Sequence, residues 1–213
     1  MTLPGMSPGS LSGPFSGRSA SRRGVLQAGL GLLAGAAPLA ACSSDPAFYA
    51  LAPWPGTAQG GAPAVIEIRT PTVALSLDRD RIVRSDEAYR VRLAGGAAWS
   101  ESLPGMIAHV LATDLQQRLP GSAVFAQNDA VATVPQAVVE LSVTRFAGDS
   151  RGFAVLAGSL GVHRPGAGGA AGALSLAGPI SGSGTGAMVA ALSALLGQVA
   201  DQAAAQLRAL PAA

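Results

Sequence analysis

The chain has 213 residues, with 14 basic residues, all of them arginine, and 12 acidic residues, which give a formal charge of +2. Three of the arginines precede residue 24, so the rest of the chain holds 11 arginines against 12 acids and is close to neutral, at −1. A nearly neutral domain lacks the basic surface of a nucleic-acid binder. The single cysteine excludes an intramolecular disulfide framework.

The first 41 residues have the pattern of a signal peptide rather than of a fold. A start with basic residues and no acid is followed by an apolar run over 25–37. That run is about 13 residues long, whereas a permanent membrane span needs about 20. Arg22-Arg23 resembles the twin-arginine export signal; a simple positively charged start is the alternative, and both interpretations stay open.

The apolar run ends in Leu39-Ala40-Ala41-Cys42, which resembles a lipobox. In such a motif the cysteine carries diacylglycerol on its thiol and a further acyl chain on its amino group, and two or more acyl chains anchor a protein stably. We therefore predict a signal peptide over 1–41, a lipidated tether over 42–47 and a domain over 48–213. No other cofactor is expected.

The tether also predicts where the domain lies. Five residues separate Cys42 from Phe48, which reach less than about 20 Å when fully extended, so the domain lies almost on the bilayer. Residue 43 is Ser rather than Asp. By resemblance to lipoprotein sorting rules, this favours the periplasmic face of the outer membrane, with retention in the inner membrane as the open alternative.

Hydrophobic periodicity places two helices among short strands. Apolar residues at three- and four-residue steps predict amphipathic helices over 101–119, with Ser100 as N-cap, and over 185–210. Alternating or apolar runs between turn signals predict strands, the turns including 85–87 and Gly148-Asp149. The predicted strands lie, in chain order, at 48–51, 64–69, 81–84, 89–93, 122–127, 136–147, 151–163 and 171–180. This order predicts a single α+β domain, in which two amphipathic helices pack on one face of an antiparallel β-sheet.

Several segments together resemble the ABC-type transport auxiliary lipoprotein family. The segments that match are Phe48-Tyr49-Ala50-Leu51 soon after the cysteine, 77–84 (LDRDRIVR), 98–103 (AWSESL), Leu111-Ala112 with Asp114-Leu115, and the closing Ala-rich helix. The chain departs from the family at Leu75-Ser76, where a proline is common, and in the Gly- and Ala-rich segment 151–180.

The resemblance implies a non-enzymatic subunit of an intermembrane lipid transport system. The implied partners are a periplasmic MCE-domain protein and its ABC transporter, which move phospholipid or another hydrophobic solute. Some members of the family form rings, so a homo-oligomeric ring is one expectation. The alternative is an assembly or pilot lipoprotein that escorts an outer-membrane protein.

Four residues are candidates for partner contacts. Arginine suits bidentate contacts to carboxylate or phosphate, which favours Arg79 and Arg84 together with the neighbouring Asp78. Trp99 is a candidate anchor. The alternatives are a solvated, self-paired strand edge for the charged residues and a place in the core for the tryptophan. Trp54 follows the tether closely enough for contact with lipid headgroups, although chance exposure explains it equally well.

Signals for catalysis are weak. His109 and His163 have no clustered ligands that would form a metal site. The segment 182–186 (GSGTG) lacks both the central serine of a nucleophile elbow and the lysine of a phosphate-binding loop. An enzyme that uses Ser181, Ser183 and His163 is the hypothesis with the least support.

Overall fold

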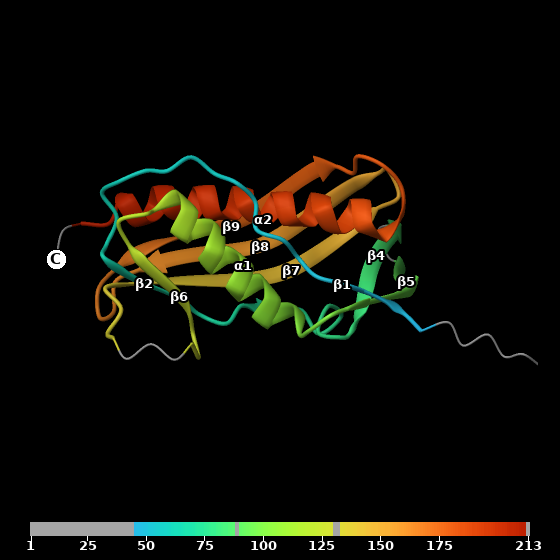
Figure 1. Ribbon diagram of the computed structural model, residues 1–213, viewed down its shortest axis with the longest axis horizontal. Coiled ribbons are helices and arrows are strands. Elements are labelled where there is room, and N and C mark those ends of the chain that lie inside the picture. Colours follow the sequence, from blue (N-terminus) through green and yellow to red (C-terminus); the bar gives the residue numbers. More distant parts are fainter. Residues whose placement is uncertain (1–44, 88–89, 130–132, 212–213) are drawn as a thin grey trace, which may run out of the picture. The chain divides into compact units, whose positions relative to one another are not determined.

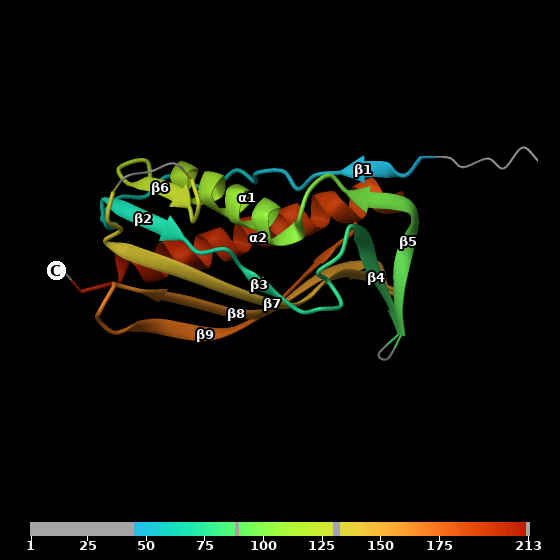
Figure 2. The same cartoon turned by 90° about the horizontal axis from the view of Figure 1, so that it is seen from below.

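The computed structural model describes residues 45–87, 90–129 and 133–211; the predicted signal peptide and Cys42 lie outside these ranges, as does Tyr89 of a predicted strand. Within these ranges nine strands form one mixed sheet, and two helices lie together on one of its faces (Figures 1 and 2). The predicted α+β class, the single domain and the placement of both helices on one face are confirmed.

Strand β7 (Ala137–Asp149) organises the sheet. Along one edge it pairs antiparallel with β8 (Phe153–His163), which pairs in turn with β9 (Gly169–Pro179). Along its other edge lie β2 (Val65–Ile68), β3 (Thr72–Val73) and the end of β4 (Arg81–Glu87), all parallel to it. Farther out on this side, β6 (Ala123–Ala126) is parallel to β2, and β5 (Arg90–Trp99) pairs antiparallel with β4 and parallel with the edge strand β1 (Ala47–Tyr49).

The sheet is therefore mixed, and the expectation of a purely antiparallel sheet is wrong. Strands β2, β3 and β4 follow one another along β7 in the same direction. The chain then returns through β5, a helix and β6, which is the long crossover that parallel pairing requires. Local alternation reports which face is buried, but it carries no information about strand direction.

Within β7 a bulge changes the face on which its side chains lie. The register with β8 shifts between Val143 and Arg145, so Thr144 is an additional residue. Every side chain beyond it therefore changes face: Phe146 becomes fully buried and Arg145 is exposed, whereas strict alternation places them the other way round. The β7–β8 turn likewise lies after Asp149, at 150–152, rather than at Gly148-Asp149.

Helices α1 (Leu103–Arg118) and α2 (Gly184–Arg208) cover the sheet with their apolar faces. Both predicted apolar stripes are buried, although α1 begins after Ser102 instead of Ser100 because Pro104 fits the first turn. Among the described helices, α2 is long and apolar enough by composition to cross a membrane, but 61% of that stretch is buried within the domain. It is the core helix of this fold.

Candidate functional site

The predicted partner-contact residues fall into two separate depressions of the surface. Asp78, Arg79 and Trp99 line the first, a shallow hollow of about 360 Å³ in front of α1. Arg84 lines the second, beside Arg92 and the first turn of α2. The structure therefore brings three of the four together and leaves Arg84 apart.

The two kinds of side chain in the first depression differ in what they offer a partner. Asp78 and Arg79 are exposed on the turn before β4. Trp99 is 4% exposed, and the centroid of its ring lies 6.4 Å from the ring centroid of Phe146 in the core. Its backbone N–H donates to the carbonyl of Asp80 at 2.7 Å, which fixes the turn onto the strand end. The indole therefore supports the depression from below, and the charged side chains form its rim.

A second feature, for which the sequence gives no recognisable motif, is the segment 50–64 between β1 and β2. It crosses both helices on their outer side (Figure 1), and we call it the strap. Hydrogen bonds hold the strap against both helices along its length. The N–H of Ala52 donates to Ser193 of α2 at 3.1 Å, the N–H of Gln59 donates to the carbonyl of Arg118 at 2.6 Å, and Arg208 donates to the carbonyl of Gly60 at 2.7 Å.

The central fastening uses two charged side chains that are buried in α1. Asp114 is 0% exposed and Arg118 is 1% exposed. Asp114 Oδ1 accepts the backbone N–H of Trp54 at 2.6 Å, and Arg118 Nη1 donates to the carbonyl of the same residue at 3.0 Å. Both polar groups of the Trp54 backbone are thus satisfied by charged side chains that lie one helical turn apart.

Arg118 also joins the two helices. Its Nε donates to Asp201 Oδ1 at 2.6 Å and its Nη2 donates to the carbonyl of Gly197 at 3.0 Å, both on α2. A further bond, from Nη1 to the carbonyl of Asp114, measures 3.1 Å. One guanidinium therefore ties together α1, α2 and the strap, a use that matches its planar fork of five N–H donors.

The buried carboxylate of Asp114 has too few hydrogen bonds to replace the hydration that it loses. Its Oδ2 has no hydrogen-bond partner. Burial raises the pKa of Asp114 from 3.8 to about 6 and outweighs the Trp54 hydrogen bond and the positive charge of Arg118, which lower it; the negative charge of Asp201 adds to the increase. At neutral pH the carboxylate is ionised at a cost in stability, and that cost decreases as the pH falls below about 6.

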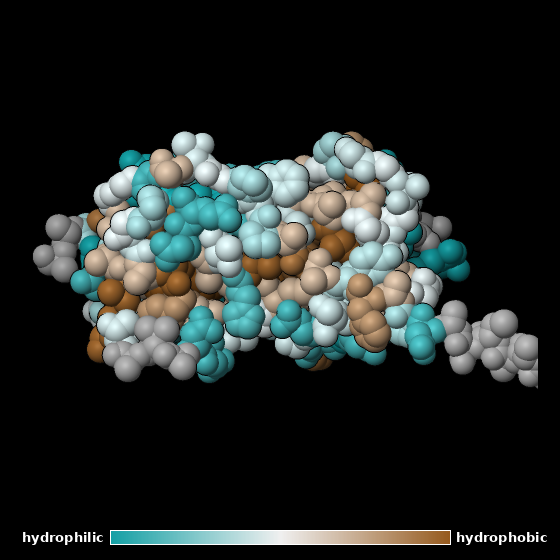
Figure 3. Space-filling view, viewed as in Figure 1, coloured by the Kyte–Doolittle hydropathy of each residue, from teal (hydrophilic) through white to brown (hydrophobic). Residues whose placement is uncertain are grey.

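Two glycines make room for this arrangement. A Cβ atom at Gly56 would overlap the Arg118 guanidinium, and one at Gly197 would lie 2.8 Å from the Cβ of Trp54. The backbone of Trp54 can approach α2 only because residue 197 has no side chain. The Trp54 indole nevertheless remains 44% exposed. The strap thus holds an aromatic ring at a fixed position on the helix-side surface, where apolar surface occurs as separate patches bounded by polar groups (Figure 3).

Other polar groups serve local structure. His109 Nε2 lies 3.7 Å from Asp129 Oδ1 at the surface. Asp149, beside the β7–β8 turn, accepts the backbone N–H groups of Arg151 and Phe153, each at 2.9 Å. These bonds lower the pKa of Asp149 against the opposing effect of its burial. Within 45–87, 90–129 and 133–211, no three His, Cys, Asp or Glu side chains gather as metal ligands would.

Comparison with known proteins agrees with this architecture. The model of the family described as ABC-type transport auxiliary lipoprotein component matches residues 49–204. No curated protein matches the chain. A crystal structure of an uncharacterized protein superposes with a TM-score of 0.64 at 20% identity, covering 76% of this chain and 97% of the other.

A second similar fold is the crystal structure of protein XCC0632 from Xanthomonas campestris, described under DUF330. It has a TM-score of 0.60 at 20% identity and covers 73% of this chain and 91% of the other. At this identity the two structures support the fold alone. The family model runs from the last residue of β1 through most of α2 and includes every residue of the two depressions and of the buried cluster. The chain therefore belongs to the ABC-type transport auxiliary lipoprotein component family.

Proposed function

We propose that this auxiliary lipoprotein is a non-enzymatic subunit of an MCE-type system that moves phospholipid or another hydrophobic molecule between two membranes. Acyl chains on Cys42 would hold it on the periplasmic face of the outer membrane. The family match over 49–204 supports the proposed role in transport. The proposed lipid anchor is supported by the lipobox-like motif Leu39-Ala40-Ala41-Cys42.

The partner contacts are proposed at the first depression. Asp78 and Arg79 offer opposite charges side by side on an exposed rim, and rim charges set association rate and specificity more than affinity. Beneath them Trp99 is immobilised by the core. A partner protein with a complementary charged pair would find this rim already ordered, which lowers the entropic cost of binding. Arg84 belongs to the second depression and is proposed as a separate contact.

The test is co-purification from native membranes. The tagged full-length protein is extracted in mild detergent, and its partners and bound lipids are identified by mass spectrometry. We expect an MCE-domain protein and components of an ABC transporter. Arg79→Glu should reduce their recovery several-fold, whereas Arg164→Glu, at the opposite end of the sheet, should leave it unchanged.

A different set of partners would identify the alternative. Recovery of a secretin or another outer-membrane client, without MCE or ABC components, would show that the chain is an assembly or pilot lipoprotein. Mass spectrometry of the mature chain tests the anchor separately, because an unmodified Cys42 would remove the proposed tether.

A further inference from the structure

The large exposed hydrophobic side chains are unevenly distributed over the domain. Seven such residues are exposed among the described residues. Four of them, Phe48, Val91, Leu93 and Phe153, belong to β1, β5 and the start of β8. These elements meet at one end of the sheet, which we call the anchor-side end because the described part of the chain begins there, just before β1 (Figures 1 and 2).

Strand pairing places these elements together. The end of β4 pairs with the end of β7 at Gly148 and Asp149, and β8 starts directly after the following turn. Phe153 pairs with Pro179, the last residue of β9. The hairpin partner of β4 is β5, and β1 lies beside β5. The opposite end of the sheet holds the residues before β7 and after β8, including Val134 and Arg164.

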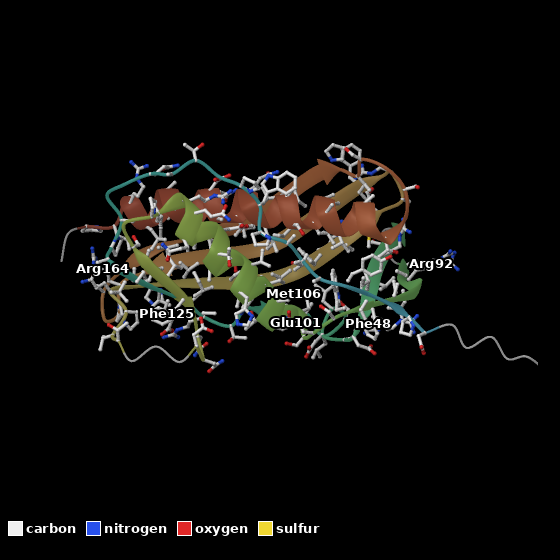
Figure 4. All side chains as sticks on the ribbon, in the orientation of Figure 1. Phe48, Arg92, Glu101, Met106, Phe125 and Arg164 are labelled. Carbon is white, nitrogen blue, oxygen red and sulfur yellow. The ribbon has the colours of Figure 1, made fainter. Side chains whose placement is uncertain are left out.

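Positive charge accompanies the apolar side chains. The segment 81–93 holds four arginines and two acids, and Arg90 and Arg92 are exposed. Asp45, two residues before β1, adds one negative charge to this end. Figure 4 shows Arg92 at the anchor-side end, projecting away from the body of the domain, and Arg164 at the other end. Exposed aromatic and aliphatic groups beside arginine are the combination that binds the surface of an anionic bilayer.

The short tether indicates that this surface faces the bilayer. Asp45 follows Cys42 by three residues, which span at most about 11 Å. If the acyl chains on Cys42 enter a bilayer, the anchor-side end is held against the headgroups. The 13 residues of β7 place the opposite end roughly 40 Å away.

We propose that the anchor-side end rests on the phospholipid bilayer, with Phe48 and Phe153 among the headgroups and Arg90 and Arg92 beside lipid phosphates. This inference rests on the proposed lipid anchor and goes beyond it, because a tether alone would leave the domain free to tumble. Contact at this end makes α2 stand steeply on the membrane and presents the strap and the Asp78 depression sideways to partners.

The geometry also separates Trp54 from the bilayer. Trp54 packs over Gly197, which is 13 residues along α2 from Gly184 at the anchor-side end. At 1.5 Å per residue this is about 20 Å, well beyond the headgroup layer. The interfacial role considered for Trp54 from sequence is therefore assigned to Phe48 and Phe153 instead.

The test measures depth in the membrane with the lipidated full chain. Ser181→Cys and Ala167→Cys place labels two residues beyond the two ends of β9, at exposed positions; the acylated Cys42 does not react. Each labelled protein is reconstituted in vesicles of phosphatidylethanolamine and phosphatidylglycerol that contain a nitroxide lipid quencher. For a surface buried about 5–10 Å in the headgroup region, we expect fluorescence at position 181 to fall by at least about twofold, and fluorescence at 167 to be unchanged.

Matched variants then test the named residues. Phe48→Ser with Phe153→Ser should restore most of the fluorescence at 181, whereas Val134→Ser, at an 81% exposed site, should not. The double variant Arg90→Gln with Arg92→Gln should also increase the fluorescence at 181, whereas the control Arg164→Gln should leave it unchanged. Circular dichroism checks that each variant is folded.

Two results would overturn the inference, and they can be distinguished. Equal quenching at 181 and 167 in an acylated protein would show a tumbling domain and leave the lipid anchor standing. A mature chain whose mass lacks acyl groups would remove the anchor itself, and with it the geometric argument for this end.

Discussion

Replacing Asp114 by Asn tests the buried charge cluster through its pH dependence. Burial raises the pKa of this carboxyl to about 6 in the folded state, against 3.8 when exposed. The folded state therefore binds the proton more tightly than the unfolded chain does. The resulting stabilisation is fully present below pH 3.8 and is lost as the pH rises through about 6.

The expected size follows from these two pKa values. Between pH 7.5 and pH 5 the Asp114 proton should increase the free energy of unfolding by about 1.4 kcal/mol, and complete protonation would contribute about 3 kcal/mol. The charged groups that face Asp114 are Arg118 on its own helix and Asp201 on α2. Asn keeps an oxygen for the N–H of Trp54 but has no proton to gain in this range.

Urea unfolding of the wild type and of Asp114→Asn, followed by circular dichroism at both pH values, measures the effect. Subtracting the pH dependence of the variant from that of the wild type removes the contributions of all other titrating groups. We expect a difference of about 1–1.5 kcal/mol, with the dependence on urea concentration unchanged. Equal pH dependence in the two proteins would show that Asp114 is hydrated and would refute its burial as an ionised group.

Three further substitutions probe the same architecture. Arg118→Met removes the bonds to α2 and to the strap and should cost about 2–4 kcal/mol in urea unfolding; a loss below 1 kcal/mol would contradict the linking role. Gly197→Val should displace Trp54, which a red-shifted emission of that tryptophan would report, whereas Gly60→Val, at a site with open space around it, should leave the spectrum unchanged. Phe146→Ala should lower stability by about 3–5 kcal/mol, measured by thermal unfolding, because the bulge turns this ring into the core; a surface-like loss of under 0.5 kcal/mol would contradict that register.

The sequence predicts the elements of this fold better than their arrangement. Helix periodicity identifies both apolar stripes because each helix has one buried face, and the long strands β7 and β8 follow from their apolar runs. Parallel pairing along β7 stays hidden because it depends on contacts between segments far apart in the chain. The two-residue strand β3 is too short to produce a periodic signal.

The strap and its charge cluster were missed for a related reason. On a helix, Asp114 and Arg118 at i and i+4 have the spacing of an ordinary exposed ion pair. A signal was nevertheless present, since both lie on the apolar stripe of α1, next to Leu111 and Leu115. Charged residues at stripe positions indicate a buried polar contact. Which segment supplies it, here the loop around Trp54, could not be deduced without the fold.

The position of the strap has a mechanical consequence. A pull directed along the axis of β1 would shear its parallel pairing with β5 instead of peeling it open. The same tension then reaches the strap, whose fastenings at Asp114, Ser193 and Arg208 spread it over both helices. A load applied along β1 would thereby be spread over both helices and the core of the domain.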